Sequence, residues 1–195
     1  MNERIAQIVK EMENLREELK KEIKKEEEKL HYRMKDGRVF FDEEVVSKHK
    51  EELISLVEYV KKAKLLYVLT APFIYMMIIP ALVLDVFVTI YHEINFRVYK
   101  IPLVKRSDYI VFDRQYLSYL NVLEKINCLY CSYFNGLIAY VAEIAARTEQ
   151  FWCPIKHAKK IAYMHTHYVN FLPYGDGERY HERLLKLREK LRKEG

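Results

Sequence analysis

Residues 65–84 contain no charged side chain over twenty positions, and this run limits the available folds more than any other feature. The stretch reads LLYVLTAPFIYMMIIPALVL. A twenty-residue helix is about 30 Å long, which matches the hydrocarbon core of a bilayer. Lysine and arginine residues flank the run on both sides, at 61–64 and at 97–106. Because such flanks tend to stay in the cytoplasm, we expect both ends of the segment on that side.

Pro80 lies near the end of this run and argues against a simple span. Proline removes a backbone donor and crowds the carbonyl of Met76, so we expect the helix to bend or break there. We therefore interpret residues 65–96 as an apolar helix–break–helix hairpin in one leaflet, with a single span as an alternative. The predicted partner is membrane lipid, and the predicted location is the inner (cytoplasmic) membrane with the rest facing the cytoplasm. A buried hairpin in a soluble helical protein stays open as another interpretation.

The overall composition favours helices. The chain has 195 residues, of which 50% are apolar and 31% are charged, with five glycines and five prolines. Few glycines and prolines argue against disorder and against repetitive all-β folds. The predicted fold class is therefore a mainly α-helical bundle. The net charge of +5 comes from basic residues that are mixed with acids, so no nucleic-acid partner is expected.

The N-terminal region, residues 1–64, is predicted to be helical and highly charged. Within residues 1–35 the apolar positions are three or four apart, at Ile5, Ile8, Met12, Leu15, Leu19 and Ile23. This narrow seam between Glu and Lys runs is typical of a coiled-coil-like amphipathic helix. It predicts either a homo-oligomer formed through residues 1–35 or packing on the chain's own domain. A turn is expected at Asp36 and Gly37, and Asp42 is the predicted N-cap of a second helix.

The remaining chain divides into a helical region, 97–175, and a basic C-terminal helix, 176–195. Residues 97–112 alternate in an extended fashion around Pro102, and helical spacing resumes from residue 114. The pair Asn135 and Gly136 indicates a turn or a helix start. The last two predicted helices cover residues 154–171 and 178–193.

All three cysteines and one histidine fall into two pairs with metal-ligand spacing. Cys128 and Cys131 form a C-x2-C pair, and Cys153 precedes His157 by four residues. With a helix over the intervening residues and a turn, the two pairs are expected to meet. Three thiolates and one imidazole are a closed ligand set for zinc, so we predict a structural zinc site. Iron or an iron–sulfur cluster is the alternative cofactor, since soft thiolates accept either.

Two further residues are candidates for contacts around the predicted metal site. Glu149 and His165 are placed by sequence near it, as possible outer-shell groups. The odd number of cysteines does not suit a self-contained disulfide framework, which favours a reducing compartment.

The leading functional interpretation is a membrane-associated metal-binding protein. A membrane-bound redox enzyme, using an iron centre or the dithiol of Cys128 and Cys131, is the first alternative. An oligomeric interaction scaffold is the second. Whether the protein is an enzyme is left open, because the sequence carries none of the nucleotide, hydrolase or metalloprotease motifs.

The blocks NCLYCSY and NGLIAYVAEIAARTEQFWCPIKHA, within residues 80–160, resemble an uncharacterised family of small bacterial proteins. The resemblance covers under half of the chain. It implies a bacterial origin and marks residues 127–158 as the hallmark of the family. It implies no activity, cofactor or catalytic residue.

Overall fold

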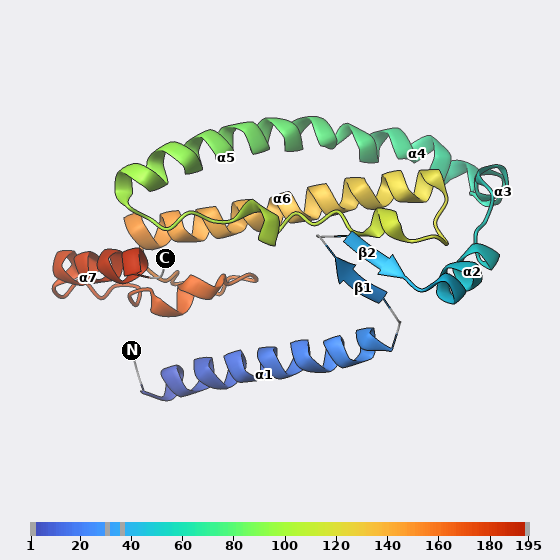
Figure 1. The fold of residues 1–195 in the computed structure, drawn as a ribbon. Coiled ribbons are helices and arrows are strands. Elements are labelled where there is room, and N and C mark those ends of the chain that lie inside the picture. The colour runs from blue at the N-terminus through green and yellow to red at the C-terminus, as the bar shows by residue number, and fades with distance from the viewer. Residues whose placement is uncertain (1–2, 30–31, 36–37, 194–195) are drawn as a thin grey trace. The chain divides into compact units, whose positions relative to one another are not determined.

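The chain is mainly helical in a computed structural model that describes residues 3–29, 32–35 and 38–193 (Figure 1). This confirms the predicted fold class. The α-helices are α1 (Glu3–Glu28), α2 (Glu43–Glu51), α3 (Leu56–Lys62), α4 (Leu65–Met76), α5 (Ile78–Tyr99), α6 (Val122–Trp152) and α7 (Tyr180–Lys193). Short 3-10 helices are η1 (Arg106–Asp108), η2 (Arg114–Tyr116) and η3 (Thr166–Asn170), and the strands are β1 (Tyr32–Lys35) and β2 (Arg38–Phe41).

The chain separates into two compact units. Unit 1 comprises residues 1–73 and 112–132, and unit 2 comprises residues 74–111 and 133–195. These boundaries differ from the regions expected from composition, because both units combine segments that are distant in the sequence.

Unit 1 begins with α1 and continues into a two-stranded antiparallel hairpin, in which Tyr32 pairs with Phe41 and Lys35 with Arg38. The helix expected over residues 1–35 is therefore too long, because its last residues form β1. The predicted turn at residues 36–37 lies outside the described residues. Asp42 is the N-cap of α2, as predicted, although without a side-chain capping hydrogen bond.

Helix α6 starts in unit 1 at a capping box. The Asn121 side chain accepts from the Glu124 N–H at 3.0 Å, and the Glu124 carboxylate accepts from the Asn121 N–H at 2.9 Å. This reciprocal pair satisfies two free donors of the first helical turn. It explains why α6 begins at Val122 rather than at residue 114, where helical spacing resumes in the sequence.

The predicted break in the apolar segment lies at Met77, between α4 and α5, three residues before Pro80. Met77 has φ −64° and ψ −13°, which are right-handed helical values. A chain can reverse its direction only through residues whose φ and ψ lie outside the helical range. Met77 has helical values, so the chain does not reverse at this break. The position of the break agrees with the proline argument, and the expected helix–break–helix reversal is absent at this residue.

Helix α5 ends at Lys100, which has a left-handed φ of 58°. The Ile101 N–H donates to the Phe96 carbonyl at 2.8 Å, as in a Schellman cap, and Pro102 then prevents the helix from continuing. Residues 101–111, here called the return segment, run back along α5. Arg106 and Asp85 pair near the middle of α5, whereas Val104 pairs with His92 closer to its end.

In unit 2, α5 and the second part of α6 lie side by side and run in the same direction (Figure 1). Tyr133 bonds to Asp85 near the start of the pair, whereas Tyr99 stacks on Phe151 at its end. The core lies between these helices and the return segment, and its buried members include Ala81, Phe96, Ile101, Val104, Ile110, Leu137, Tyr140, Ile144 and Phe151.

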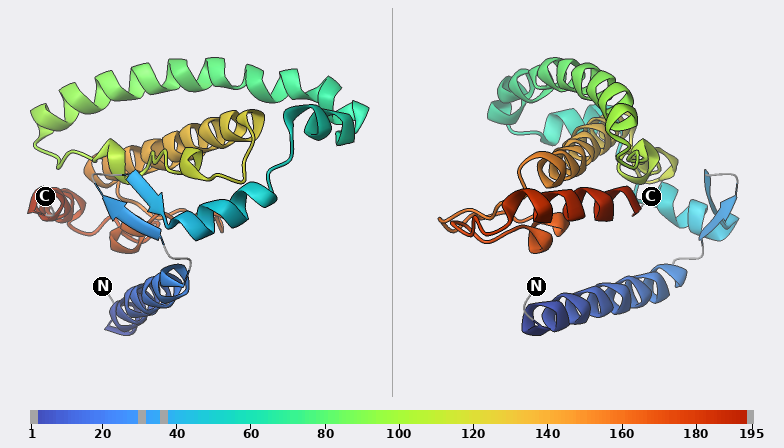
Figure 2. Two further views of the ribbon diagram at one scale, coloured as in Figure 1. Left: turned by 45° about the vertical axis from the view of Figure 1, so that its right-hand side comes forward. Right: turned by 90° about the vertical axis from the view of Figure 1, so that its left-hand side faces the viewer.

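Helix α7 lies against the C-terminal end of α6 (Figure 2). The Arg188 Nε donates to the Phe151 carbonyl at 2.7 Å, and Leu191 is buried in the core of unit 2. The predicted C-terminal helix is thus confirmed, with its leucine stripe facing the unit and its basic residues mostly outside.

Candidate functional site

Helix α6 separates the cysteines that were predicted to share a metal ion. Cys128 and Cys131 lie one turn apart within it, and Cys153 follows its last residue. Helix α6 is continuous through Asn135 and Gly136, where a turn was expected, so that prediction is wrong.

His157 lies beyond the end of α6 in extended chain rather than on a helix. Ile155 pairs with Leu172 in an isolated bridge, and the Lys156 N–H donates to the Leu172 carbonyl at 2.8 Å. The helix predicted over residues 154–171 is therefore wrong, with η3 as its only helical part among the described residues. The His157 N–H donates to the Tyr168 hydroxyl at 2.7 Å, and the two rings stack.

The structure does bring together the two residues predicted to surround the metal. His165 Nε2 lies 3.1 Å from the Glu149 carboxylate. A second pair is adjacent: His167 Nε2 lies 3.0 Å from Glu143, and its Nδ1 lies 2.6 Å from the Gln150 amide oxygen. These contacts join the second half of α6 to η3.

Within the part of the chain that the structure describes, no three His, Cys, Asp or Glu side chains converge as metal ligands would. Cys128 and Cys131 belong to unit 1, whereas Cys153 and His157 belong to unit 2, so the Cys3His site expected from these four residues stays a prediction.

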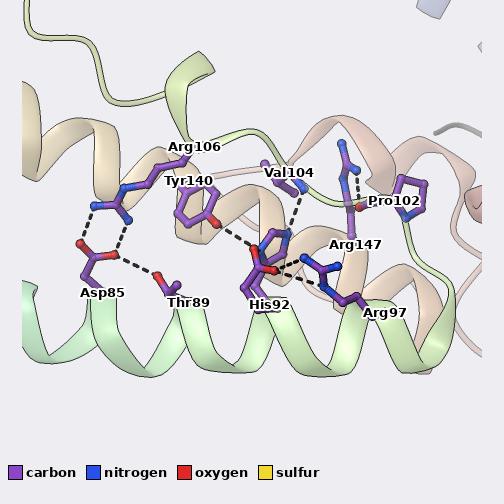
Figure 3. Close-up of polar contacts among 10 residues, drawn as sticks. Asp85, Thr89, His92, Arg97, Pro102, Val104, Arg106, Tyr140 and Arg147 are labelled. Carbon is purple, nitrogen blue, oxygen red and sulfur yellow. Dashed lines mark hydrogen bonds and ion pairs between the residues drawn. The ribbon is translucent and has the colours of Figure 1, made fainter.

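A set of polar side chains on the inner face of α5 was missed by the sequence reasoning; we call it the polar clasp. Asp85, Thr89 and His92 are spaced by four and three residues, which places them on one face of the helix. Figure 3 shows all three pointing from α5 toward the return segment and α6. The signal in the sequence was Asp85, a lone charge that interrupts an otherwise apolar stretch.

Asp85 holds the return segment through a bidentate ion pair. Both guanidinium nitrogens of Arg106 donate to the carboxylate, the second at 2.6 Å (Figure 3). The Tyr133 hydroxyl donates to the same carboxylate at 2.8 Å. The hydrogen bonds to Asp85 raise the pKa of Arg106, so the guanidinium stays charged at any ordinary pH. Such fork-to-fork pairs fix geometry as well as adding stability.

His92 is buried and uses both ring nitrogens. Its Nε2 accepts from the Val104 N–H at 2.9 Å, and its Nδ1 lies 3.2 Å from the Tyr140 hydroxyl. A nitrogen that accepts from an amide carries no proton, so the neutral imidazole with hydrogen on Nδ1 satisfies both contacts. His92 therefore joins the return segment to α6 through α5.

Two contacts with α6 complete the fixing of the return segment. The Arg147 guanidinium donates to the Pro102 carbonyl at 2.8 Å and to Glu143 at 2.7 Å. Gly136 lies directly under the Tyr109 carbonyl and Ile110, where a Cβ would come within 2.5 Å of the carbonyl oxygen. The glycine that suggested a turn instead lets two backbones approach closely.

The outer face of α5 is apolar and uncovered. Its exposed large apolar side chains are Ile79, Leu82, Val83, Val86, Phe87, Ile90, Ile94 and Val98. Two helical segments, Leu65–Tyr99 and Val122–Trp152, are long and apolar enough to cross a membrane, and 6% of the first segment's apolar window is buried. Except for the exposed Glu93–Arg97 ion pair near its C-terminal end, α5 carries polar groups inside and apolar groups outside, which is the reverse of a helix in a water-soluble protein.

Comparison with family models, curated proteins and solved structures finds no significant match to the chain. The functional argument therefore rests on the residues themselves.

Proposed function

We propose that the protein is a monotopic membrane protein that lies along the cytoplasmic face of the inner membrane. The observation that carries this proposal is the reversed polarity of α5. Phe87 and Val98 are each 68% exposed on its outer face, whereas Asp85, Thr89 and His92 face inward. Burying one large apolar side chain such as Phe87 away from water is worth about 1.5–3 kcal/mol, and several Leu, Val and Ile side chains lie on the same face. Contact with one lipid leaflet would remove all of these apolar side chains from water at once.

The parallel course of α5 and α6 supports attachment to one face over crossing. If both helices crossed the bilayer, the return segment would have to cross it in the opposite direction. Apart from the single 3-10 turn η1, that segment is irregular, and it exposes Lys105 and Asp108. Each such charge costs about 2.5–3.5 kcal/mol at the centre of a bilayer even on the most lenient scale. With α5 in the plane of the membrane, both charges stay in water.

The C-terminal ends of α5 and α6 carry groups suited to a membrane surface. Tyr99 lies edge-on to Trp152, with ring centroids 5.3 Å apart, and Trp152 is half exposed. The Arg188 guanidinium lies 5.6 Å from the Trp152 ring centroid, and Arg192 donates to the Tyr99 carbonyl. Aromatic and basic residues gather where headgroups meet hydrocarbon, which matches this cluster.

The decisive experiment measures on which side the two ends of the apolar segment lie. In a background with all three native cysteines changed to serine, Lys64→Cys and Lys100→Cys are labelled with a membrane-impermeant maleimide. We expect both to react in inside-out vesicles and neither to react in intact cells. If the two positions react from opposite sides, the segment crosses the membrane and the proposal is wrong.

A matched pair of variants tests which surface contacts the lipid. We expect Phe87→Asp to lower partitioning into vesicles by at least about tenfold, since it removes a buried aromatic and adds a charge. Val111→Asp is the control, because Val111 is also exposed and apolar but lies on the return segment. Equal losses for both variants would indicate general unfolding, and no loss for Phe87→Asp would contradict the assigned face.

A metal-binding role is the second candidate, either as the predicted four-ligand site or as a two-ligand site. Cys128 and Cys131 lie one helical turn apart, which lets both thiolates reach one ion. Zinc remains the proposed metal, with iron or an iron–sulfur cluster as the alternative, and the other two ligands would come from Cys153 and His157, as predicted, or from a second copy. The dithiol redox role also stays a proposal for this pair.

Elemental analysis of variants separates the two-ligand site from the four-ligand site expected from the sequence. With two ligands, Cys128→Ser and Cys131→Ser lose the metal, whereas Cys153→Ser and His157→Ala keep it. Loss in all four variants would support the predicted Cys3His site. Metal-free protein that is well folded would rule out both.

A further inference from the structure

Helix α1 presents an apolar seam that has no cover. Ile8, Met12, Leu15, Leu19 and Ile23 are 42–64% exposed, although they are spaced by three or four residues along one face. A helix whose stability came from packing on its own unit would bury such a seam. The seam extends over nearly three heptads, with Ile5, Met12 and Leu19 at the first position, called a, and Ile8 and Leu15 at the fourth, called d.

We propose that α1 forms a parallel coiled coil with α1 of a second copy of this chain. The argument for a second copy over a lipid surface is charge. Helix α1 carries nine glutamates against seven lysines and arginines, so it is weakly acidic. Helices that lie on anionic membranes are instead rich in lysine and arginine on their polar face. An acidic helix is repelled by an anionic lipid surface. The α1 of a second copy offers an equally apolar seam, and its mixed charges can be paired.

The charges beside the seam select the parallel direction. In a parallel pair, the residue before each a position faces the residue five places later on the partner. Glu11 then faces Arg16 of the other helix, and symmetry makes two such attractive pairs. The neighbouring pairs combine Arg4 with Val9 and Glu18 with Ile23, which adds no like-charge contact.

The antiparallel pair with full overlap sets like charges against each other. Pairing Met12 with Leu15 of the other helix places Glu11 opposite Glu18, and Arg4 opposite Lys25. Each contact occurs twice by symmetry, so four repulsive pairs replace two attractive ones. Like charges in these positions disfavour an arrangement, and coiled coils use them to set orientation.

The seam also limits how tightly the pair can bind. Glu22 occupies the d position after Leu19, and Ile23 lies beside it, so the regular part ends there. Fewer than three complete heptads give a marginal coiled coil in free solution. We therefore expect a reversible dimer whose population rises when both copies are held on one membrane, where their effective concentration is higher.

Cysteine cross-linking on the full-length protein tests the direction. In the background with Cys128, Cys131 and Cys153 changed to serine, Leu15→Cys should form a disulfide-linked dimer, since d faces d only in a parallel pair. Glu17→Cys, on the opposite face of α1, is the control and should not. If Leu15→Cys forms no dimer alone but joins to a Met12→Cys chain, the pair is antiparallel and the proposal is overturned.

Charge exchange tests the same point without new cysteines. In a parallel pair, Glu11→Arg places Arg opposite Arg16 and should weaken dimerisation roughly five- to tenfold, from two altered pairs. In an antiparallel pair, the same change would face Glu18 and strengthen it. The double exchange Glu11→Arg with Arg16→Glu should restore the wild-type constant, measured as mass by light scattering in detergent. A monomer at all concentrations, or three copies, would refute the proposal.

Discussion

The close contact between Gly136 and the return segment makes an unusual prediction about helix α6. In the middle of a helix, replacing Gly with Ala normally stabilises by about 1 kcal/mol, because Ala is the better helix former. Here a Cβ would lie 2.5 Å from the Tyr109 carbonyl oxygen and 2.9 Å from the Ile110 Cα. Both are backbone atoms, which cannot rotate away as a side-chain end can.

The expected sign is therefore reversed. Overpacking a filled site costs about 1–3 kcal/mol, and contacts with fixed backbone atoms belong at the upper end of that range. Subtracting the helical gain of about 1 kcal/mol leaves Gly136→Ala less stable by roughly 2 kcal/mol. For a chain of this size, such a loss lowers the melting temperature by about 4–8 °C.

Thermal unfolding followed by circular dichroism in mild detergent measures this change. Ala139→Gly is the control, because Ala139 lies on an exposed part of the same helix and reports helix propensity alone. We expect it to cost about 1 kcal/mol. If Gly136→Ala melts at or above the wild-type temperature, the return segment does not press on α6 at Gly136, and the close backbone contact there is not formed.

Three further changes probe single contacts by the same melts. Asp85→Asn leaves Arg106 without its ionised partner and should cost about 1.5–3 kcal/mol; an unchanged melt would mean that the pair is not formed. Tyr133→Phe removes one hydrogen bond to Asp85 and should cost about 1 kcal/mol, so a larger loss than for Asp85→Asn would contradict the proposed order. The hydrogen bond from Arg183 lowers the pKa of Asp176 below its usual 3.8, so Asp176→Asn should destabilise at pH 7. This contribution is present above pH 3.8 and lost as the pH falls through the lowered value, so variant and wild type should melt together in strong acid.

The spacing of apolar residues predicted the helices in which those residues all lie on one face. The seam of α1 and the leucine stripe of α7 gave correct helices with boundaries off by a few residues. Residues 154–171 defeated the same reasoning, because their apolar residues do not form one helical face: Pro154 and Phe171 are buried, whereas Tyr163 and Met164 are exposed. The Leu172 N–H donates to the Pro154 carbonyl there, and such pairing between distant residues leaves no periodic signal in the sequence.

The candidate site was hard to predict for a related reason. Gly136 follows Asn135, a combination that is common in turns, and only the contact with Ile110 explains it inside a helix. The polar clasp likewise joins Asp85 to Arg106 across a chain reversal that sequence spacing does not reveal. The cysteine pairs were judged by spacing alone, and their metal site stays a prediction.

The direction of α6 relative to α5 decides more about this protein than the apolarity of either helix. Two apolar helices in sequence are usually taken as a pair that crosses a membrane twice, which requires opposite directions. Here Asp85 contacts Tyr133 and Tyr99 contacts Phe151, so the two helices run in the same direction. The segment between them must therefore run back along the full length of α5. Its charged residues must stay in contact with water, and its buried residues must pack against the two helices. Both needs are met when α5 has lipid on its outer face only, and the basic residues at both ends of the apolar segment then lie on the same side.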